Sequence, residues 1–108
     1  MTLRTLLVAA AMLAGTGAAT ANCYELIGCD DSEYFSRGDL RQLSCQSLWE
    51  VRNLIYQQNG YCFSTRRAQQ ALGNEGCWIT EQSQVRLNAF ERENVAEIAA
   101  VEKAKGCN

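Results

Sequence analysis

Six cysteines constrain this chain more than any other feature, because their oxidation state decides whether they cross-link the fold or serve as ligands. The sequence has 108 residues, no Cys-x-x-Cys pair and no histidine. Redox and zinc sites depend on such pairs or on histidine ligands, so neither kind of site is indicated. An even number of cysteines in a short chain predicts three structural disulfides among Cys23, Cys29, Cys45, Cys62, Cys77 and Cys107.

The N-terminus predicts export. Residues 1–21 hold one cation, Arg4, then an apolar stretch from Leu6 to Ala14, then small residues. This is the arrangement of a cleaved signal peptide, and the stretch is shorter than the roughly 20 apolar residues that span a membrane. The residues before Cys23 also lack the pattern of a lipoprotein. We therefore expect a soluble periplasmic or extracellular protein with no membrane insertion.

Charge gives a second restriction on partners. The segment after residue 21 has nine basic and twelve acidic side chains, a net charge of −3, and no run of Lys and Arg. A weakly acidic domain gains no long-range attraction to phosphate backbones or to anionic lipid surfaces. Nucleic acid is therefore not expected as a partner.

Helical periodicity predicts the fold class. The chain has no proline and no alternating strand pattern. Three helices are expected: one that follows Ser44 and runs to about residue 58, one at 65–72 capped by Ser64, and one at 88–105. The fold class is therefore all-α, a small disulfide-stapled domain of about three helices with ordered loops. We place a disulfide-closed segment at 22–31 and the helical domain at 32–108.

The apolar stripes of these helices predict the core. Leu48, Val51 and Ile55 share one side of the first helix at helical spacing, so we expect them to be buried. Asn88 and Glu91 have the spacing of a capping box at the start of the last helix. Its expected core residues are Leu87, Phe90, Val95, Ile98 and Val101.

Helix length limits the disulfide pairing. A straight helix from Cys45 to residue 58 spans about 20 Å, whereas the Cα atoms of a disulfide lie within about 7 Å. Cys45 therefore cannot pair with Cys62 across it. Cys23 is paired locally with Cys29. We favour Cys62–Cys77 with Cys45–Cys107, which sets the first and last helices antiparallel, and Cys45–Cys77 with Cys62–Cys107 remains open.

The end of the first helix resembles a stop signal. Asn59 and Gly60 follow the last periodic residue, and both residue types tolerate the left-handed conformation that closes a helix. Tyr61 and Phe63 are then expected to fold back onto the helix end.

A second stripe, beside the apolar one, supplies the candidate binding residues. Trp49, Arg52 and Tyr56 recur at helical spacing, and Tyr61 follows the helix end. One interpretation is structural, with the guanidinium packed against aromatic rings and donating to a carboxylate or carbonyl. The other is a platform for a ligand. The four residues are the binding site that the sequence suggests.

Catalysis, metal ligation and cofactors are not expected. Without histidine, the usual base for a Ser or Cys nucleophile is absent. Asp30, Asp31 and Glu33 fall in a polar loop, away from the desolvated cleft that acid-base chemistry needs. Arg66 and Arg67 are read as solvated charges. The sequence therefore predicts a protein that is not an enzyme.

The chain resembles the YARHG domain family in three successive blocks. These read SEYFSRGDLRQLS, LWEVRNLIYQQNGYCF and RLNAFERENVAEIAAVE. The naming motif stands here as residues 56–60, with its Tyr and Gly kept and its Ala-Arg-His replaced by Gln-Gln-Asn. The resemblance implies a small helical bacterial domain outside the cytoplasm and transfers no activity. Since Asn59 replaces the histidine, any chemistry that needs that histidine is ruled out here.

Two functions fit this sequence. The first is a non-catalytic binding or structural role in the bacterial cell envelope, with cell-wall glycan or an envelope protein as the partner. The second is a small secreted inhibitor of a hydrolase such as a lysozyme or protease. In that case the segment at 78–86 would enter the active site of the hydrolase.

Overall fold

The computed structural model describes residues 22–108, so the predicted signal peptide at 1–21 lies outside the described part. The element order is β1 (Cys23–Tyr24), β2 (Gly28–Cys29), α1 (Arg37–Leu40), α2 (Cys45–Gln58), α3 (Arg66–Leu72), the 3-10 helix η3 (Gln82–Gln84) and α4 (Ala89–Lys105). The fold is mainly helical, as predicted, and the three expected helices correspond to α2, α3 and α4. No helix within residues 22–108 combines the length and apolarity needed to cross a membrane.

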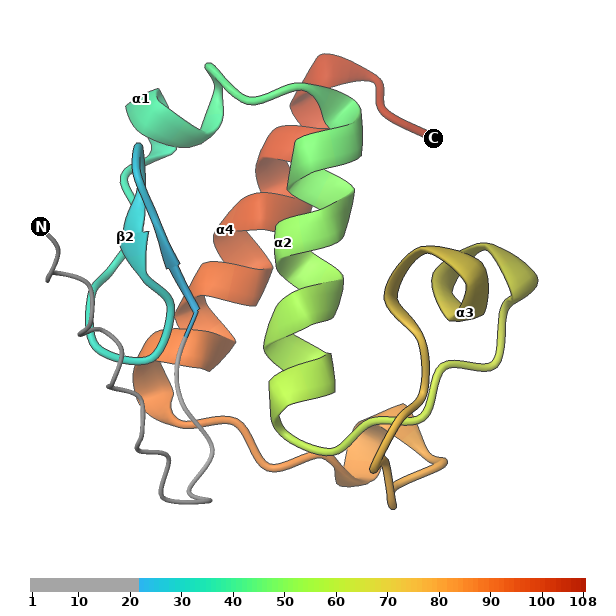
Figure 1. Ribbon diagram of the computed structural model, residues 1–108. Helices are drawn as coiled ribbons and strands as arrows, with labels where there is room; N and C mark the ends of the chain where they lie inside the picture. The colour runs from blue at the N-terminus through green and yellow to red at the C-terminus, as the bar shows by residue number, and fades with distance from the viewer. Residues whose placement is uncertain (1–21) are drawn as a thin grey trace, which may run out of the picture.

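The two long helices, α2 and α4, lie side by side and form the centre of the domain (Figure 1). Ser44 caps α2, with its hydroxyl accepting a hydrogen bond from the Ser47 N–H at 3.0 Å. Asn88 and Glu91 form the predicted capping box of α4, each side chain accepting from the backbone N–H of the other. Both helices therefore begin at residues whose side chains satisfy otherwise unpaired N–H groups.

The core lies between these helices and the N-terminal part of the chain. Leu48, Val51 and Ile55 of α2 are buried as predicted, and so are Ile98 and Val101 of α4. Leu87 and Val95 pack at the edge of the same cluster and are partly buried. The cluster also contains Ile27, Phe35 and Leu40, which the sequence did not mark as core.

The disulfides confirm the favoured pairing. Cys23 bonds to Cys29, Cys62 to Cys77, and Cys45 to Cys107. The last bond joins the start of α2 to the residue two positions beyond α4, so the two helices run antiparallel. All six cysteines are bonded.

The all-α prediction missed the N-terminal hairpin and the helix α1. Strands β1 and β2 pair antiparallel over only two residues each, with Cys23 opposite Cys29. Strands this short show no alternation in a sequence, and the disulfide supplies the closure that a longer ladder would otherwise give. Helix α1 is a single turn capped by Ser36, too short for a periodic signal. Because Ile27 belongs to the common core, the disulfide-closed segment at 22–31 packs against the helices.

Helix α3 stands beside α2, on the side opposite the hairpin (Figure 1). It begins one residue later than predicted, and Thr65 rather than Ser64 caps it by accepting from the Ala68 N–H. The Gln57 side chain donates to the carbonyls of Leu72 and Gly73 at 2.7 and 3.1 Å. Polar contacts and the neighbouring Cys62–Cys77 bond therefore tie this segment to α2.

The end of α2 differs from the prediction in one residue. Gly60 has a φ of +98°, as expected for a helix stop, but Asn59 has a φ of −102° and is not left-handed. The Asn59 side chain instead donates to the Ile55 carbonyl at 2.8 Å and to Glu91 at 3.1 Å. Asn59 therefore ends the helix through its amide group, and Gly60 alone supplies the unusual backbone.

A substitution at Gly60 tests this helix stop. A Cβ atom there would lie 2.5 Å from the ring of Trp78, and a positive φ is strained for any other residue type. We expect Gly60→Ala to lower the free energy of unfolding by about 1–3 kcal/mol. Gly38→Ala is the matched control, because its Cβ would meet no atom within 4 Å. Urea denaturation of both variants makes the measurement, and equal losses would contradict the argument.

The disulfides should differ in their contributions to stability. Cys45 and Cys107 are 62 residues apart, whereas Cys23 and Cys29 are only 6 apart. In the chain-entropy account, the first bond stabilises the fold by about 4 kcal/mol and the second by about 2 kcal/mol. Double Cys→Ser variants compared by guanidinium denaturation should therefore show the larger loss for Cys45 and Cys107. The reverse order would mean that native packing, rather than chain entropy, sets the effect.

Candidate functional site

Two surface hollows accommodate most of the candidate binding residues. The first, which we call the tryptophan hollow, has a volume of about 550 Å³ and is lined by Cys45, Gln46, Trp49, Arg52, Arg67, Ala99, Glu102, Lys103, Cys107 and Asn108. The second, the loop groove, has a volume of about 500 Å³ and is lined by Tyr56, Gln82, Ser83, Val85, Arg86, Leu87 and Arg92. Both are built from α2, α4 and the segments that flank them.

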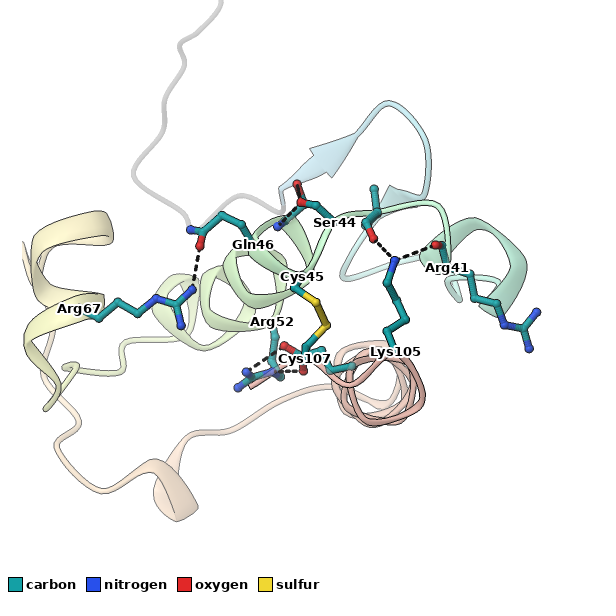
Figure 2. The surroundings of a disulfide bond; sticks show 11 residues. Arg41, Ser44, Cys45, Gln46, Arg52, Arg67, Lys105 and Cys107 are labelled. Carbon is teal, nitrogen blue, oxygen red and sulfur yellow. Dashed lines mark hydrogen bonds and ion pairs between the residues drawn. A yellow bond between two sulfur atoms is a disulfide. The ribbon is translucent and has the colours of Figure 1, made fainter.

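The tryptophan hollow is organised by Arg67 of α3. Its guanidinium lies 3.8 Å from the centre of the Trp49 ring, and one of its nitrogens donates to the Gln46 side chain at 2.7 Å. A cation over an indole face is an attractive arrangement. Figure 2 shows Arg67 reaching toward Gln46 from α3, with the Cys45–Cys107 disulfide nearby. The predicted packing of a guanidinium on an aromatic ring therefore exists, with Arg67 in place of Arg52.

Arg52 is engaged with α4. Its Nε and Nη2 atoms donate to the two carboxylate oxygens of Glu102 at 2.7 and 3.1 Å. The side chains are 27% and 13% exposed, respectively, so water screens this bidentate pair less than an ordinary surface pair. Arg52 thus matches the structural interpretation: it donates to a carboxylate and holds α2 against α4.

Tyr56 and Tyr61 lie together at the other end of the stripe. Their ring centres are 6.1 Å apart in an edge-on arrangement, and Tyr61 makes a similar contact with Phe63 at 5.4 Å. Tyr56 lines the loop groove, while Tyr61 supports its ring from the side. The structure therefore brings Trp49 and Arg52 into one hollow and Tyr56 into the other.

The cations of the two hollows are largely free of acidic partners. Among residues 22–108, only Arg37 and Arg52 form ion pairs, with Glu97 and Glu102. Arg92 donates to the Leu87 carbonyl at 2.7 Å, which leaves its charge uncompensated. The other three lining cations without an acidic partner are Arg67, Arg86 and Lys103.

Asp30 corrects the expectation that the N-terminal acids lie in a polar loop. Its side chain is fully buried, and its two oxygens accept hydrogen bonds from Gln58 at 2.8 Å and from the Tyr24 hydroxyl at 3.2 Å. The Gln58 amide also donates to Glu91 at 3.1 Å. Gln58 thus bridges two carboxylates and connects the hairpin, α2 and α4.

This burial changes proton affinities. Desolvation raises the pKa of the Asp30 carboxyl above its ordinary value, and the Glu91 carboxylate adds to the rise, while the bonds from Gln58 and Tyr24 oppose it. Burial and the neighbouring Asp30 also raise the pKa of the Tyr24 hydroxyl. A raised carboxyl pKa is common in acid catalysts. Here, however, protein donors occupy both oxygens of Asp30, so the geometry supports a role in joining segments.

Asn94 connects the same region to the chain before α1. Its side-chain oxygen accepts from the Phe35 N–H at 2.9 Å, and its nitrogen donates to the carbonyls of Asp30 and Glu33 at 3.1 and 2.8 Å. The residue is fully buried and its side chain satisfies three backbone groups. Asn94 is therefore a polar core residue that fixes an irregular segment. No group of three or more His, Cys, Asp or Glu side chains suited to a metal ion occurs within residues 22–108.

The comparison with protein families matches residues 17–103 to the YARHG domain. The chain belongs to this family. No curated protein and no solved structure matches it.

Several residues in the blocks that resemble the YARHG family make structural contacts here. The motif Tyr56 lines the loop groove, and the motif Gly60 provides the positive φ under the Trp78 ring. Asn88 and Glu91 form the cap of α4, and Asn94 fixes the segment before α1. The replacement of His by Asn at position 59 is accommodated because the amide donates to Glu91 and to a helix carbonyl.

Sequence reasoning missed four lining cations of this YARHG domain. The exposed Arg67 side chain agrees with a solvated charge, but the sequence did not predict that its guanidinium packs on Trp49. Arg86, Arg92 and Lys103 come from a loop and from α4, far from the α2 stripe in the sequence. Helical spacing alone places Arg92 and Lys103 on the same side of α4. The positions of Arg67 in α3 and of Arg86 in the loop depend on tertiary contacts, which the sequence does not show. Only the complete fold brings these side chains to the same hollows.

Asp30 should give this domain an unusual pH dependence. Between the ordinary aspartate pKa of about 3.9 and the raised pKa, the folded state binds the proton and the unfolded state does not. Stability therefore falls as the pH rises through this window. We expect the wild type to gain stability relative to Asp30→Asn as the pH falls from 7 toward 4, because the variant has no proton to bind there.

Urea denaturation at several pH values measures this difference. Asp31→Asn is the matched control, since Asp31 is the adjacent acid but is partly exposed. Its stability should follow that of the wild type. Parallel pH curves for the wild type and Asp30→Asn would contradict the assignment to Asp30.

Proposed function

We propose that this YARHG domain is an exported, non-catalytic binding module of the bacterial cell envelope, and that its ligand is cell-wall glycan. Three disulfides support export, because such bonds form and persist in oxidising compartments. Both carboxylate oxygens of the buried Asp30 accept hydrogen bonds from protein side chains, which supports a non-catalytic role.

The distribution of charge is the observation that carries the proposal. Residues 22–108 contain nine basic and twelve acidic side chains. Five of the basic side chains line the two hollows, against a single acid, Glu102. The rest of the domain is therefore strongly acidic, including two further hollows whose charged lining residues are Glu25 and Glu50 in one and Glu93 and Glu97 in the other, while the tryptophan hollow and the loop groove are cationic. A hollow lined by one sign of charge concentrates ligands of the opposite sign, so an anionic ligand is favoured.

Aromatic rings in the same hollows restrict the class of anionic ligand that fits them. Trp49 lines one hollow and Tyr56 the other, and both side chains are partly exposed. Such rings supply flat apolar contact, and adjacent hydroxyl and amide groups such as Ser83 and Gln82 supply hydrogen bonds. Cell-wall glycan presents sugar rings, hydroxyls and carboxylates together, which matches this combination.

Co-sedimentation with insoluble cell-wall glycan tests the proposal. The disulfide-bonded protein should be retained, and the double variant Arg67→Glu/Arg86→Glu should lose most of the retention because it reverses one cation in each hollow. The matched control is Arg41→Glu/Arg66→Glu, which makes the same charge change at exposed residues that line neither hollow. Figure 2 shows the Arg41 side chain pointing away from the disulfide.

The co-sedimentation results distinguish glycan binding in the hollows from no glycan binding. Retention by the wild type and the control variant, but not by the double variant, supports glycan binding in the hollows. No retention of the wild type above that of an unrelated disulfide-bonded protein would overturn the proposal. Circular dichroism of each variant checks that the fold is retained. A pull-down from envelope proteins then tests the other partner class that the sequence suggested.

A second candidate is inhibition of a secreted hydrolase. The observation that favours it is Trp78, which is 71% exposed at the start of the 78–86 segment. The Cys62–Cys77 bond anchors this segment immediately before Trp78, as in rigid inhibitory loops. Assays against lysozymes and proteases test it. Inhibition by the wild type that is lost in Trp78→Ala would support it, and no inhibition at micromolar protein would eliminate it.

A further inference from the structure

We infer that the two hollows are the ends of one binding track, and that its ligand is an extended polysaccharide chain with repeated carboxylate or phosphate groups. The inference rests on the proposed function, because it specifies the ligand class of the same surface. We call this surface the cationic track. Its residues are the five cations of the two hollows with Trp49 and Tyr56.

The contributions of α2 to the two hollows lie on one side of that helix. Trp49 and Arg52 line the tryptophan hollow, and Tyr56 lines the loop groove. At 3.6 residues per turn, these three residues fall within about 60° of one another around the helix axis. The stripe of Trp49, Arg52 and Tyr56 that the sequence suggested therefore follows one side of α2 from one hollow to the other.

Helix α4 contributes in the same way. Ala99 and Lys103 line the tryptophan hollow, and Arg92 lines the loop groove. These residues fall within about 40° of one another around the α4 axis. The helices are antiparallel, joined by Cys45–Cys107 at one end and by Gln58 and Glu91 at the other. Lys103 is therefore near the Trp49 end, and Arg92 is near the Tyr56 end.

The distance between the two hollows sets the minimum length of a ligand that contacts both. Trp49 and Tyr56 are separated by about 10 Å along α2, and Arg92 and Lys103 by about 16 Å along α4, at 1.5 Å per residue. A single sugar ring cannot reach the cations at both ends. A chain of several rings can contact both, with the Arg52–Glu102 pair beneath the part of the chain that lies in the tryptophan hollow.

The cationic residues of the track favour particular anionic groups on the ligand. Three of the four cations without an acidic partner are arginines, and a guanidinium donates parallel hydrogen bonds to a carboxylate or a phosphate. A nucleic acid also carries phosphates, and the surrounding acidic side chains act alike on either polyanion, so the compartment rather than charge separates the two. The oxidising compartment indicated by the disulfides favours an envelope polysaccharide.

Isothermal titration with soluble oligosaccharides tests the inference on the disulfide-bonded protein. Oligogalacturonates of two and six rings provide the carboxylate ligands, and phosphomannan fragments provide the phosphate ligands. We expect one six-ring chain per protein, bound at least about tenfold more tightly than the two-ring fragment. Neutral chito-oligosaccharides of equal length should bind more weakly than either anionic series. The preferred series identifies the anion.

Single substitutions at opposite ends show whether one chain spans the track. Arg67→Glu and Arg86→Glu should each weaken the six-ring chain by about tenfold or more, because each removes a charge-assisted hydrogen bond. Lys103→Glu repeats the test at the Trp49 end while the contact between Arg67 and Trp49 stays intact. Arg66→Glu, one residue from Arg67 but outside the track, is the matched control and should leave the affinity unchanged.

Independent hollows would give a different pattern, and that pattern overturns the inference. Two six-ring chains would bind per protein, and each variant would abolish one of them without changing the affinity of the other. Equal affinity for the two-ring and six-ring chains, or tighter binding of oligothymidylate than of either polysaccharide, would also overturn it. Since retention on insoluble glycan needs only one active hollow, the proposed function can stand while this inference fails.

Discussion

The contact between α2 and α4 is the constraint on which the rest of this domain depends. A disulfide fastens the pair where α2 begins, and the Gln58 bridge to Glu91 and Asp30 fastens it where α2 ends. Between them, the apolar stripes meet and Arg52 pairs with Glu102. The helices cannot slide past each other without breaking a covalent bond or separating the partly buried Arg52–Glu102 pair. Both hollows are lined by residues of these two helices, so the fixed position of α2 against α4 also fixes their shape.

The hydrogen-bonding network around Gln58 stabilises a region with little regular structure. The hairpin has two residues per strand, and the segment up to α1 has no secondary structure of its own that could hold it. Buried amides and carboxylates replace the missing ladder, since Asn94 alone satisfies three backbone groups. The same arrangement places Asp30 in a site that disfavours its charge. The buried polar groups thus hold the hairpin against α2 and α4, while the charged Asp30 lowers the stability of the domain at neutral pH.

The sequence predicted features that depend on local chemistry. The α2 stripe, the Asn88–Glu91 cap and the Gly60 stop follow from spacing and backbone preference, and helix length limited the disulfides. It could not predict that Asp30 would be buried or that Arg67 would reach Trp49, because both depend on packing between distant segments. Single-turn α1 and the short strands gave no periodic signal. Trp49, Arg52 and Tyr56 lie on one side of α2, as their spacing predicts, and their role in binding stays a prediction, whereas the positions of their cationic neighbours needed the fold.

The position of the Cys45–Cys107 bond has a consequence for when the surface becomes complete. Both cysteines line the tryptophan hollow, and Figure 2 shows the disulfide that joins them. In a chain with free thiols this bond is absent, so the end of α4 has one less attachment to α2. Assembly of the hollow is therefore tied to oxidation. The shape of this end of the hollow therefore depends on the two thiols being oxidised.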